Sequence, residues 1–469
     1  MDITIAGFFF LLGLFVLLFK KNTHSNLFAY CFCMELFVEI GYAVNLGGYP
    51  VNYRTIAEIV LALYCLFNFK YYITKQYVYY LILLFLPIFL LLVFPSNELV
   101  STIDVTWDNV LRGEKSLSNP RVNSFVLQQT FQFVLEFIIC ISILQHYRKN
   151  DYVMLLNKLS KIVNIFLVVG LVEFVARNFL GLNESWGNFL ENTFGTSSST
   201  IFESRLRGST YELTLFTKEA SHYAYCLTIM LLIKISSNIM NRKKLIDKWV
   251  AFNIMLMVFA MSFSVLLFGL FLIFVILHYR WDVIKPKSIR TEKIFLIFAI
   301  FTFGLYISAF MAGLSEDNFF SRRILSAIEE INVVTTDEWK YSNTSLEWSN
   351  RVRMLSSYQT ILTFLHRPLF GYGLGAVCSH GATTMLLSGL GVVGTYFWSK
   401  TYFFSQYLKK NFGKMTNSYK YSYFMFMGVN LLNSQGVRPF YELSAIVVII
   451  SLTFIFCKYE NIVFNESRR

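Results

Sequence analysis

Long apolar runs follow one another along nearly the whole chain, separated by short polar connections. Many of these runs approach the roughly 20 consecutive residues that an α-helix needs to cross a bilayer. They do not alternate apolar and polar residues, as the strands of a membrane β-barrel would. The pattern therefore predicts an all-α fold: a polytopic transmembrane helical bundle of about 12–13 spans. We treat residues 1–469 as a single integral membrane domain.

Basic residues cluster in the connections between the runs. Examples are Lys20 with Lys21, Lys70 with Lys75, and Arg148 with Lys149. Short cytoplasmic loops carry an excess of Lys and Arg, so placing every cluster in the cytoplasm gives one consistent path. On this path the N-terminus is outside and the C-terminus is inside. The net charge of +12 is then explained by topology, and we expect no nucleic-acid partner.

Three polar stretches remain on the non-cytoplasmic side of this path, and they cover residues 95–123, 181–218 and 313–381. The last is the largest. Its apolar spacing predicts a helix from Val352 to His366, and Pro368 should end that helix because proline is incompatible with a helix interior. We therefore expect a large helical non-cytoplasmic loop near the C-terminus.

Arginines occur in the second and third of these loops, where the positive-inside tendency would reduce their number. Arg205 and Arg207 precede a span, and Arg351 and Arg353 open the predicted loop helix. A guanidinium keeps its charge and can contact phosphate oxygens at two points. One interpretation is a metal-independent clamp for a pyrophosphate. The other is that long translocated loops carry charge freely and pair it with nearby carboxylates. Spacing alone leaves both open.

Two residues are candidates for a general base. His380 follows the turn that contains Gly371, Gly373 and Gly375, and an imidazole there could take a proton or bind a sugar hydroxyl. A lone histidine is also commonly structural. Glu219 stands at a predicted helix start, where the helix dipole favours an acid in any case. The glycine turn follows no strand, so it does not predict a dinucleotide or ATP loop.

Several glutamates fall inside predicted spans, namely Glu35, Glu39, Glu136 and Glu173. Ionisable groups inside a membrane are functional candidates by default. They can equally pair with other side chains inside the bundle, and we favour that interpretation. Cys31 and Cys33 are too close in sequence for a zinc knuckle, so we interpret them as packing residues.

The order of these elements resembles that of the O-antigen polymerase and O-antigen ligase superfamily. One match is Arg353 and a helix, then His366-Arg367-Pro368-Leu369-Phe370-Gly371-Tyr372-Gly373-Leu374-Gly375, then His380 before the next span. A second match is Arg205-Leu206-Arg207-Gly208-Ser209-Thr210-Tyr211, with Glu219 after it. The chain departs from the family pattern where Gly381 follows His380 and Ala220 follows Glu219, so the choice of base stays open.

The resemblance implies a glycosyltransferase of the bacterial cytoplasmic (inner) membrane whose active site faces the periplasm or exterior. It would join undecaprenyl-diphosphate-linked oligosaccharide repeats into O-antigen or capsular polysaccharide with inversion. Arginines would bind the pyrophosphate, and no metal or cofactor would be needed. The partners would be the lipid-linked oligosaccharide and the bilayer, and a chain-length regulator stays an open question. The alternatives are a ligase that moves finished polysaccharide to lipid A-core and a transporter that flips the lipid-linked repeat.

Overall fold

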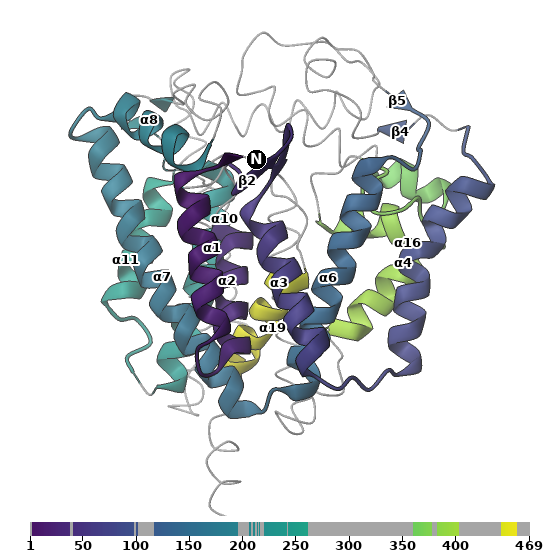
Figure 1. Cartoon of the computed structure of the whole chain (residues 1–469), viewed down its shortest axis with the longest axis horizontal. Coiled ribbons are helices and arrows are strands. Elements are labelled where there is room, and N and C mark those ends of the chain that lie inside the picture. The colour runs from purple at the N-terminus through teal and green to yellow at the C-terminus, as the bar shows by residue number, and fades with distance from the viewer. Residues whose placement is uncertain are drawn as a thin grey trace, which may run out of the picture.

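The computed structural model is mostly helical (Figure 1). It describes residues 2–37, 41–97, 100–101, 117–195, 206–207, 210–211, 213, 215, 220–241, 243–260, 360–377, 382–402 and 442–456.

The described helices pack side by side in a bundle. They are α1 (Ile5–Leu18), α2 (Thr23–Phe37), α3 (Tyr53–Asn68), α4 (Lys75–Val93), α6 (Ser124–His146), α7 (Lys149–Asn178), α8 (Asn183–Phe194), α10 (Ala220–Met240), α11 (Lys248–Phe259), α16 (Ala382–Tyr402) and α19 (Glu442–Phe456). α3 packs against α2 and α6, α4 against α16, and α10 against α7, α11 and α19. Their buried apolar side chains form one continuous core that includes α2, α3, α6, α7, α10 and α19.

Short antiparallel sheets join the helices, a feature that the all-α prediction did not include. β1 (Asp2–Ile3), β2 (Val44–Leu46) and β3 (Tyr49–Val51) form one sheet, in which Ile3 pairs with Val44 and Leu46 with Tyr49. Gly47 and Gly48 both have positive φ, which suits the tight two-residue turn between β2 and β3. The other pairs are β4 (Val100–Ser101) with β5 (Leu117–Ser118), and β6 (Leu206–Arg207) with β7 (Thr210–Tyr211).

The chain alternates between two ends of the bundle. β1 precedes α1 and pairs with β2, which follows α2, so both helices have one terminus at this sheet. The backbone N–H of Tyr42 donates to the Phe194 carbonyl at 3.1 Å, which places the end of α8 there too. Figure 1 shows the N-terminus, β2, β4, β5 and α8 at this end, drawn at the top. We call it the strand end.

The connections that follow α1, α3, α6 and α10 lie at the opposite end, which we call the basic end (Figure 1). Four pairs of basic residues lie in or beside these connections: Lys20 and Lys21, Lys70 and Lys75, Arg148 and Lys149, and Lys243 and Lys244. The charge pattern and the fold therefore agree on which connections share a side.

Three of the described helices are long and apolar enough to cross a membrane, namely Lys75–Val93, Val126–His146 and Lys149–Asn178. Shorter apolar helices accompany them. Large apolar side chains such as Phe9, Phe85 and Ile165 are exposed on the outside of the bundle, where acyl chains rather than water would suit them. These features are those of a helical membrane protein. The total of about 12–13 spans stays a prediction.

The described residues cover parts of the predicted loops. Residues 360–366 are helical, and the helix ends before Pro368 as predicted, whereas residues 352–359 lie outside the described residues. The stretch 181–218 contains α8 and the β6–β7 hairpin, which the sequence pattern did not predict. Most of 313–381 lies outside the described residues, and so does Glu39.

Candidate functional site

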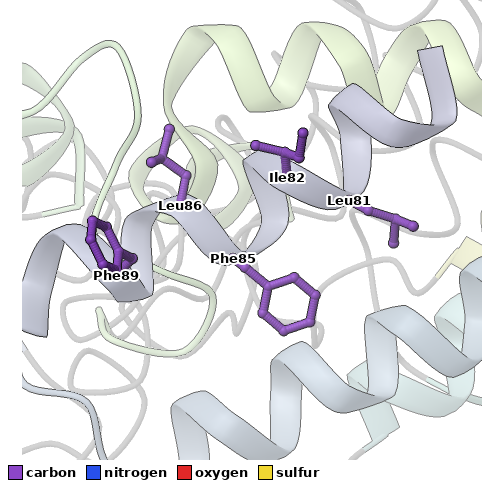
Figure 2. A pocket seen from close by; sticks show the side chains of 5 residues that line it. All are labelled: Leu81, Ile82, Phe85, Leu86 and Phe89. Carbon is purple, nitrogen blue, oxygen red and sulfur yellow. The ribbon is translucent and has the colours of Figure 1, made fainter. Parts of the chain in front are cut away.

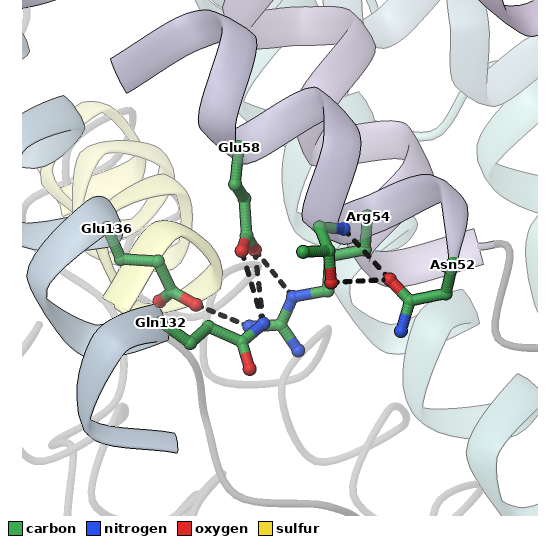
Figure 3. Close-up of polar contacts among 6 residues, drawn as sticks. Asn52, Arg54, Glu58, Gln132 and Glu136 are labelled. Carbon is green, nitrogen blue, oxygen red and sulfur yellow. Dashed lines mark hydrogen bonds and ion pairs between the residues drawn. The ribbon is translucent and has the colours of Figure 1, made fainter. Parts of the chain in front are cut away.

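A buried ion-pair network joins α3 to α6 (Figure 3). Arg54, in the first turn of α3, donates from Nε to Glu58 Oε1 at 2.5 Å and from Nη2 to Glu136 Oε1 on α6. Gln132 Nε2, one turn from Glu136, donates to Glu58 Oε2 at 3.2 Å. Both carboxylates are at most 1% exposed. Because burying unpaired charge is costly, the network fixes the positions of these two helices toward the strand end.

A second buried cluster lies at the end of α7, where the helix meets the strand end. Arg177 Nη1 donates to Glu173 Oε1 at 2.9 Å, and Arg177 Nε donates to Asn183 Oδ1 of α8 at 2.9 Å. The other oxygen of Glu173 accepts the backbone N–H of Leu215 at 2.5 Å. Leu215 is buried with φ of +51°, an unusual backbone conformation for a residue with a side chain. The carboxylate therefore holds a loop residue in a conformation that the loop would rarely adopt alone.

The same end of α7 holds the β6–β7 hairpin by its backbone. Asn178 Oδ1 accepts the N–H of Tyr211 at 2.6 Å, and Asn178 Nδ2 donates to the Tyr211 carbonyl at 3.2 Å. The Arg177 guanidinium lies 5.4 Å from the centre of the Tyr211 ring, which is a cation–π distance. In the hairpin register Arg207 pairs with Thr210. The strand that carries Arg207 is thus attached to α7 through two points of its partner strand.

The glycine turn after Pro368 is built into a break in α16. Gly391 has φ of +66° and ψ of −176°, which interrupts the helix. Before the break, the Ser388 and Gly389 carbonyls accept the N–H groups of Tyr372 and Gly373 at 2.9 and 2.8 Å.

After the break, the Val392 and Val393 N–H groups donate to the Pro368 and Leu369 carbonyls at 2.8 and 3.2 Å. The turn therefore provides hydrogen-bond partners for backbone groups on both sides of the break. Without the turn, these groups would be unpaired in a low-dielectric surrounding.

Two glycines of this arrangement have no room for a side chain. A Cβ on Gly371 would lie 2.5 Å from the carbonyl oxygens of Ser388 and Gly389, and one on Gly391 would lie 2.3 Å from the Leu369 carbonyl. The turn uses its amides within the protein, because Gly371, Tyr372 and Gly373 all donate to carbonyls. Its role is consequently to place the chain that enters α16, and those three amides are not free for an anion.

Arg367 attaches the glycine turn to α4. Its Nη2 donates to the Phe94 carbonyl at 3.2 Å, and its guanidinium lies 4.8 Å from the centre of the Tyr372 ring. Along α4, an apolar groove of roughly 370 Å³ is lined by Leu81, Ile82, Phe85, Leu86 and Phe89 (Figure 2). The groove has no ionisable side chain, so it suits hydrocarbon and offers nothing to an anion.

Most of the site residues predicted from the sequence lie outside the described residues. These are Arg205, Glu219, Arg351, Arg353 and His380. For Arg207 the backbone is described, as part of β6, and the side chain is not. The proposed clamp and the choice of base therefore stay predictions. The structure does describe residues that are close to these candidates in sequence. Val377, in the glycine turn, precedes His380, and Tyr211 follows Arg207 in the β6–β7 hairpin.

Sequence reasoning selected Glu136 and Glu173 but missed their partners, Arg54 and Arg177. The expectation that these glutamates pair inside the bundle is confirmed. The signal that could have found the arginines is their spacing of four residues from Glu58 and Glu173, which brings side chains together on one helix face.

Within the described residues, no group of three or more His, Cys, Asp or Glu side chains could hold a metal ion. Cys31, Cys33, Cys65, Cys140 and Cys226 are buried and form no disulfide within the described part of the chain, which fits packing residues.

The chain was compared with known proteins. No family model matches it, and neither a curated protein nor a solved structure matches it.

Proposed function

We propose that the chain is a membrane glycosyltransferase that joins undecaprenyl-diphosphate-linked oligosaccharide repeats into O-antigen or capsular polysaccharide. The motif order that resembles the O-antigen polymerase and ligase superfamily motivates the proposal. The observation that carries it furthest is the attachment of the β6–β7 hairpin to the buried Glu173–Arg177 cluster. The hairpin includes β6, the strand that carries Arg207. It is held at the strand end of the bundle by contacts that require the charged side chains of Glu173 and Arg177 to be buried.

In this proposal the arginines act on the leaving group. When a hydroxyl attacks the anomeric carbon, the bond to the diphosphate breaks and negative charge develops on its oxygens. Arg205, Arg207, Arg351 and Arg353 would bind that charge, and they would bind it more strongly in the transition state than in the substrate. His380 or Glu219 would accept the proton of the attacking hydroxyl. The product would carry the inverted configuration.

The two attachments described above then have separate tasks. The α7 cluster would position the Arg205–Tyr211 element. The glycine turn and broken α16 would position the segment that contains His380. Precise placement matters because small displacements of reacting groups cost large factors in rate.

The proposal also assigns the two ends of the bundle to sides of the membrane. The basic end would face the cytoplasm, following the positive-inside tendency, and the strand end would face the periplasm or exterior. The chain would then be a bundle of about 12–13 spans in the bacterial cytoplasmic membrane, with the loop 313–381 outside. The lipid-linked oligosaccharide would enter from the bilayer.

The test is a polysaccharide ladder from cells that carry single variants. Arg205→Ala and Arg353→Ala should leave a folded protein at normal abundance and abolish long polysaccharide. Arg121→Ala is a matched control, because Arg121 is exposed in the loop before α6 at the same end and the charge change is equal. Normal ladders in both clamp variants would contradict the proposal.

The same assay separates the rival functions. Loss of a polymerase leaves one attached repeat, whereas loss of a ligase leaves none. Purified protein that extends lipid-linked repeats without other enzymes would distinguish a polymerase from a transporter that flips them.

A further inference from the structure

A polar groove lies on α7 toward the basic end, at the opposite end of the helix from the Glu173–Arg177 cluster. It has a volume of roughly 420 Å³ and is lined by Asn150, Val153, Met154, Asn157, Lys158 and Lys161. These residues recur every three or four positions, so they occupy one face of a single helix. The groove therefore combines two ammonium groups and two amides on one face of α7.

Neighbouring helices fix the polar side chains of the groove. Lys158 Nζ donates to Ser25 Oγ and, at 2.6 Å, to Asn26 Oδ1 at the start of α2. Asn157 Oδ1 accepts from Ser237 Oγ at 3.0 Å and from Asn241 Nδ2 at 2.7 Å, both at the end of α10. The Asn157 amide is thereby oriented by its oxygen, and its Nδ2 makes no hydrogen bond to any described residue.

The lysines are not neutralised by carboxylates among the residues that the structure describes. Among the described residues near this end, Asp151 and Asp247 act as helix caps instead. Asp151 accepts the Arg148 N–H at 2.9 Å, and Asp247 accepts the Val250 N–H at 2.9 Å. Lys161 is exposed. The groove is therefore a positive site without a matching anion in the described part of the protein.

The position of the groove along α7 indicates which anion it fits. α7 has 30 residues, or roughly 45 Å, and exceeds the roughly 30 Å hydrocarbon core of a bilayer. Its last lysine is Lys161, and the residues that follow are mostly apolar. Ile165, Val168 and Val172 are exposed and lie 4, 7 and 11 residues after Lys161, on the same face. The groove is thus continuous with an exposed apolar stripe on the same helix face. With that stripe in the hydrocarbon core, the groove would lie near the level of the lipid phosphates.

We propose that this groove binds the phosphate of an anionic phospholipid. The ammonium groups of Lys158 and Lys161 and the amide of Asn157 surround the phosphate, and an acyl chain lies along Ile165, Val168 and Val172. An anionic lipid is favoured over a zwitterionic one because a headgroup ammonium repels the two lysines. Continuity with the apolar stripe favours a lipid over free phosphate, which would gain nothing from that stripe.

The experiment uses the full-length protein purified in detergent and titrated with phosphatidylglycerol or with phosphatidylcholine of the same acyl chains. Native mass spectrometry gives the bound lipid, and thermal unfolding gives the stabilisation. The unmodified protein should retain phosphatidylglycerol in preference to phosphatidylcholine. Lys158→Gln with Lys161→Gln should weaken phosphatidylglycerol binding on the order of tenfold to thirtyfold. Arginine at both positions should retain it.

Two further variants distinguish loss of lipid binding at the groove from misfolding and from a general loss of positive charge. Lys243→Gln with Lys244→Gln makes the same charge change at exposed positions of the basic end and should leave binding unchanged. Lys161→Gln alone breaks no described contact, so its lowered affinity would not reflect misfolding. Equal lipid retention in the groove and control variants would overturn the proposal. Displacement of the lipid by inorganic phosphate at a matched concentration would overturn the assignment to a lipid.

Discussion

Each of the two buried arginine clusters contains an Arg–Glu ion pair between residues four positions apart on one helix. One pair lies at the start of its helix and the other at the end. Arg54 precedes Glu58 by four residues in the first turn of α3, whereas Arg177 follows Glu173 by four residues in the last turn of α7. The helix dipole disfavours a cation at the start of a helix and favours one at the end. Arg54 accordingly has two carboxylate partners on two helices.

At the favourable helix end, Arg177 needs less compensation from carboxylates. Its partner Glu173 has an oxygen that accepts a loop N–H, and Arg177 itself reaches Asn183 and the Tyr211 ring. One cluster therefore fixes two helices to each other, and the other fixes a loop to a helix. Variants at the two clusters should therefore fail in different ways.

The largest effect is expected for Arg54→Ala. Both carboxylates lose their shared cation while they stay buried, which should lower stability by about 3–5 kcal/mol. The measurement is thermal or denaturant unfolding of the purified protein. Adding Glu58→Gln and Glu136→Gln to Arg54→Leu should restore much of that stability, since no uncompensated charge is then left. An unchanged unfolding midpoint in Arg54→Ala would show that the network does not hold the helices.

A smaller effect on stability and a larger local effect are expected for Glu173→Gln. The substitution keeps the side-chain volume but removes the charge that both Arg177 and the Leu215 N–H contact, at a cost of about 1.5–3 kcal/mol. Amide hydrogen exchange should rise in a peptide that covers residues 206–215. Arg54→Ala, measured under conditions where it stays folded, should leave exchange in that peptide unchanged. The reverse pattern would contradict the division between the two clusters.

The smallest effect is expected for Gln132→Ala. Gln132 is half-buried and donates to Glu58, which keeps its contact with Arg54, so the loss should be about 0.5–1.5 kcal/mol. The unfolding midpoint should fall slightly, and the ladder assay should show normal polysaccharide. A loss as large as that of Arg54→Ala would mean that the amide, and not the guanidinium, is the main link between α3 and α6.

Hydropathy and charge patterns predicted the helical membrane class and grouped the basic connections that follow α1, α3, α6 and α10 at one end of the bundle. Both follow from local rules: apolar length for a span, and Lys or Arg between spans. The end of the loop helix before Pro368 was also predictable, because proline acts on its own helix.

Other features depend on contacts between distant segments. Glycine permits a positive φ but does not require it, so the glycine at position 391 alone does not predict the break. The break also needs the Pro368 and Leu369 carbonyls, which accept the N–H groups that follow it. The N–H of Leu215 meets Glu173, which lies 42 positions away in the chain. The sequence could identify Glu173 as an acid inside a predicted span, but it could not show which loop residue the carboxylate binds.

The backbone hydrogen bonds between the glycine turn and the two parts of α16 have a consequence for membrane insertion during synthesis. Residues 367–377 leave the ribosome before α16 does, so the acceptors and donors that the broken helix requires are already made when it enters the bilayer. A half-helix inserted alone would present the Val392 and Val393 N–H groups to hydrocarbon, at a cost of several kcal/mol for each group. α16 is thus expected to insert only together with the glycine turn that precedes it, as one unit that cannot be truncated between Gly375 and Gly391.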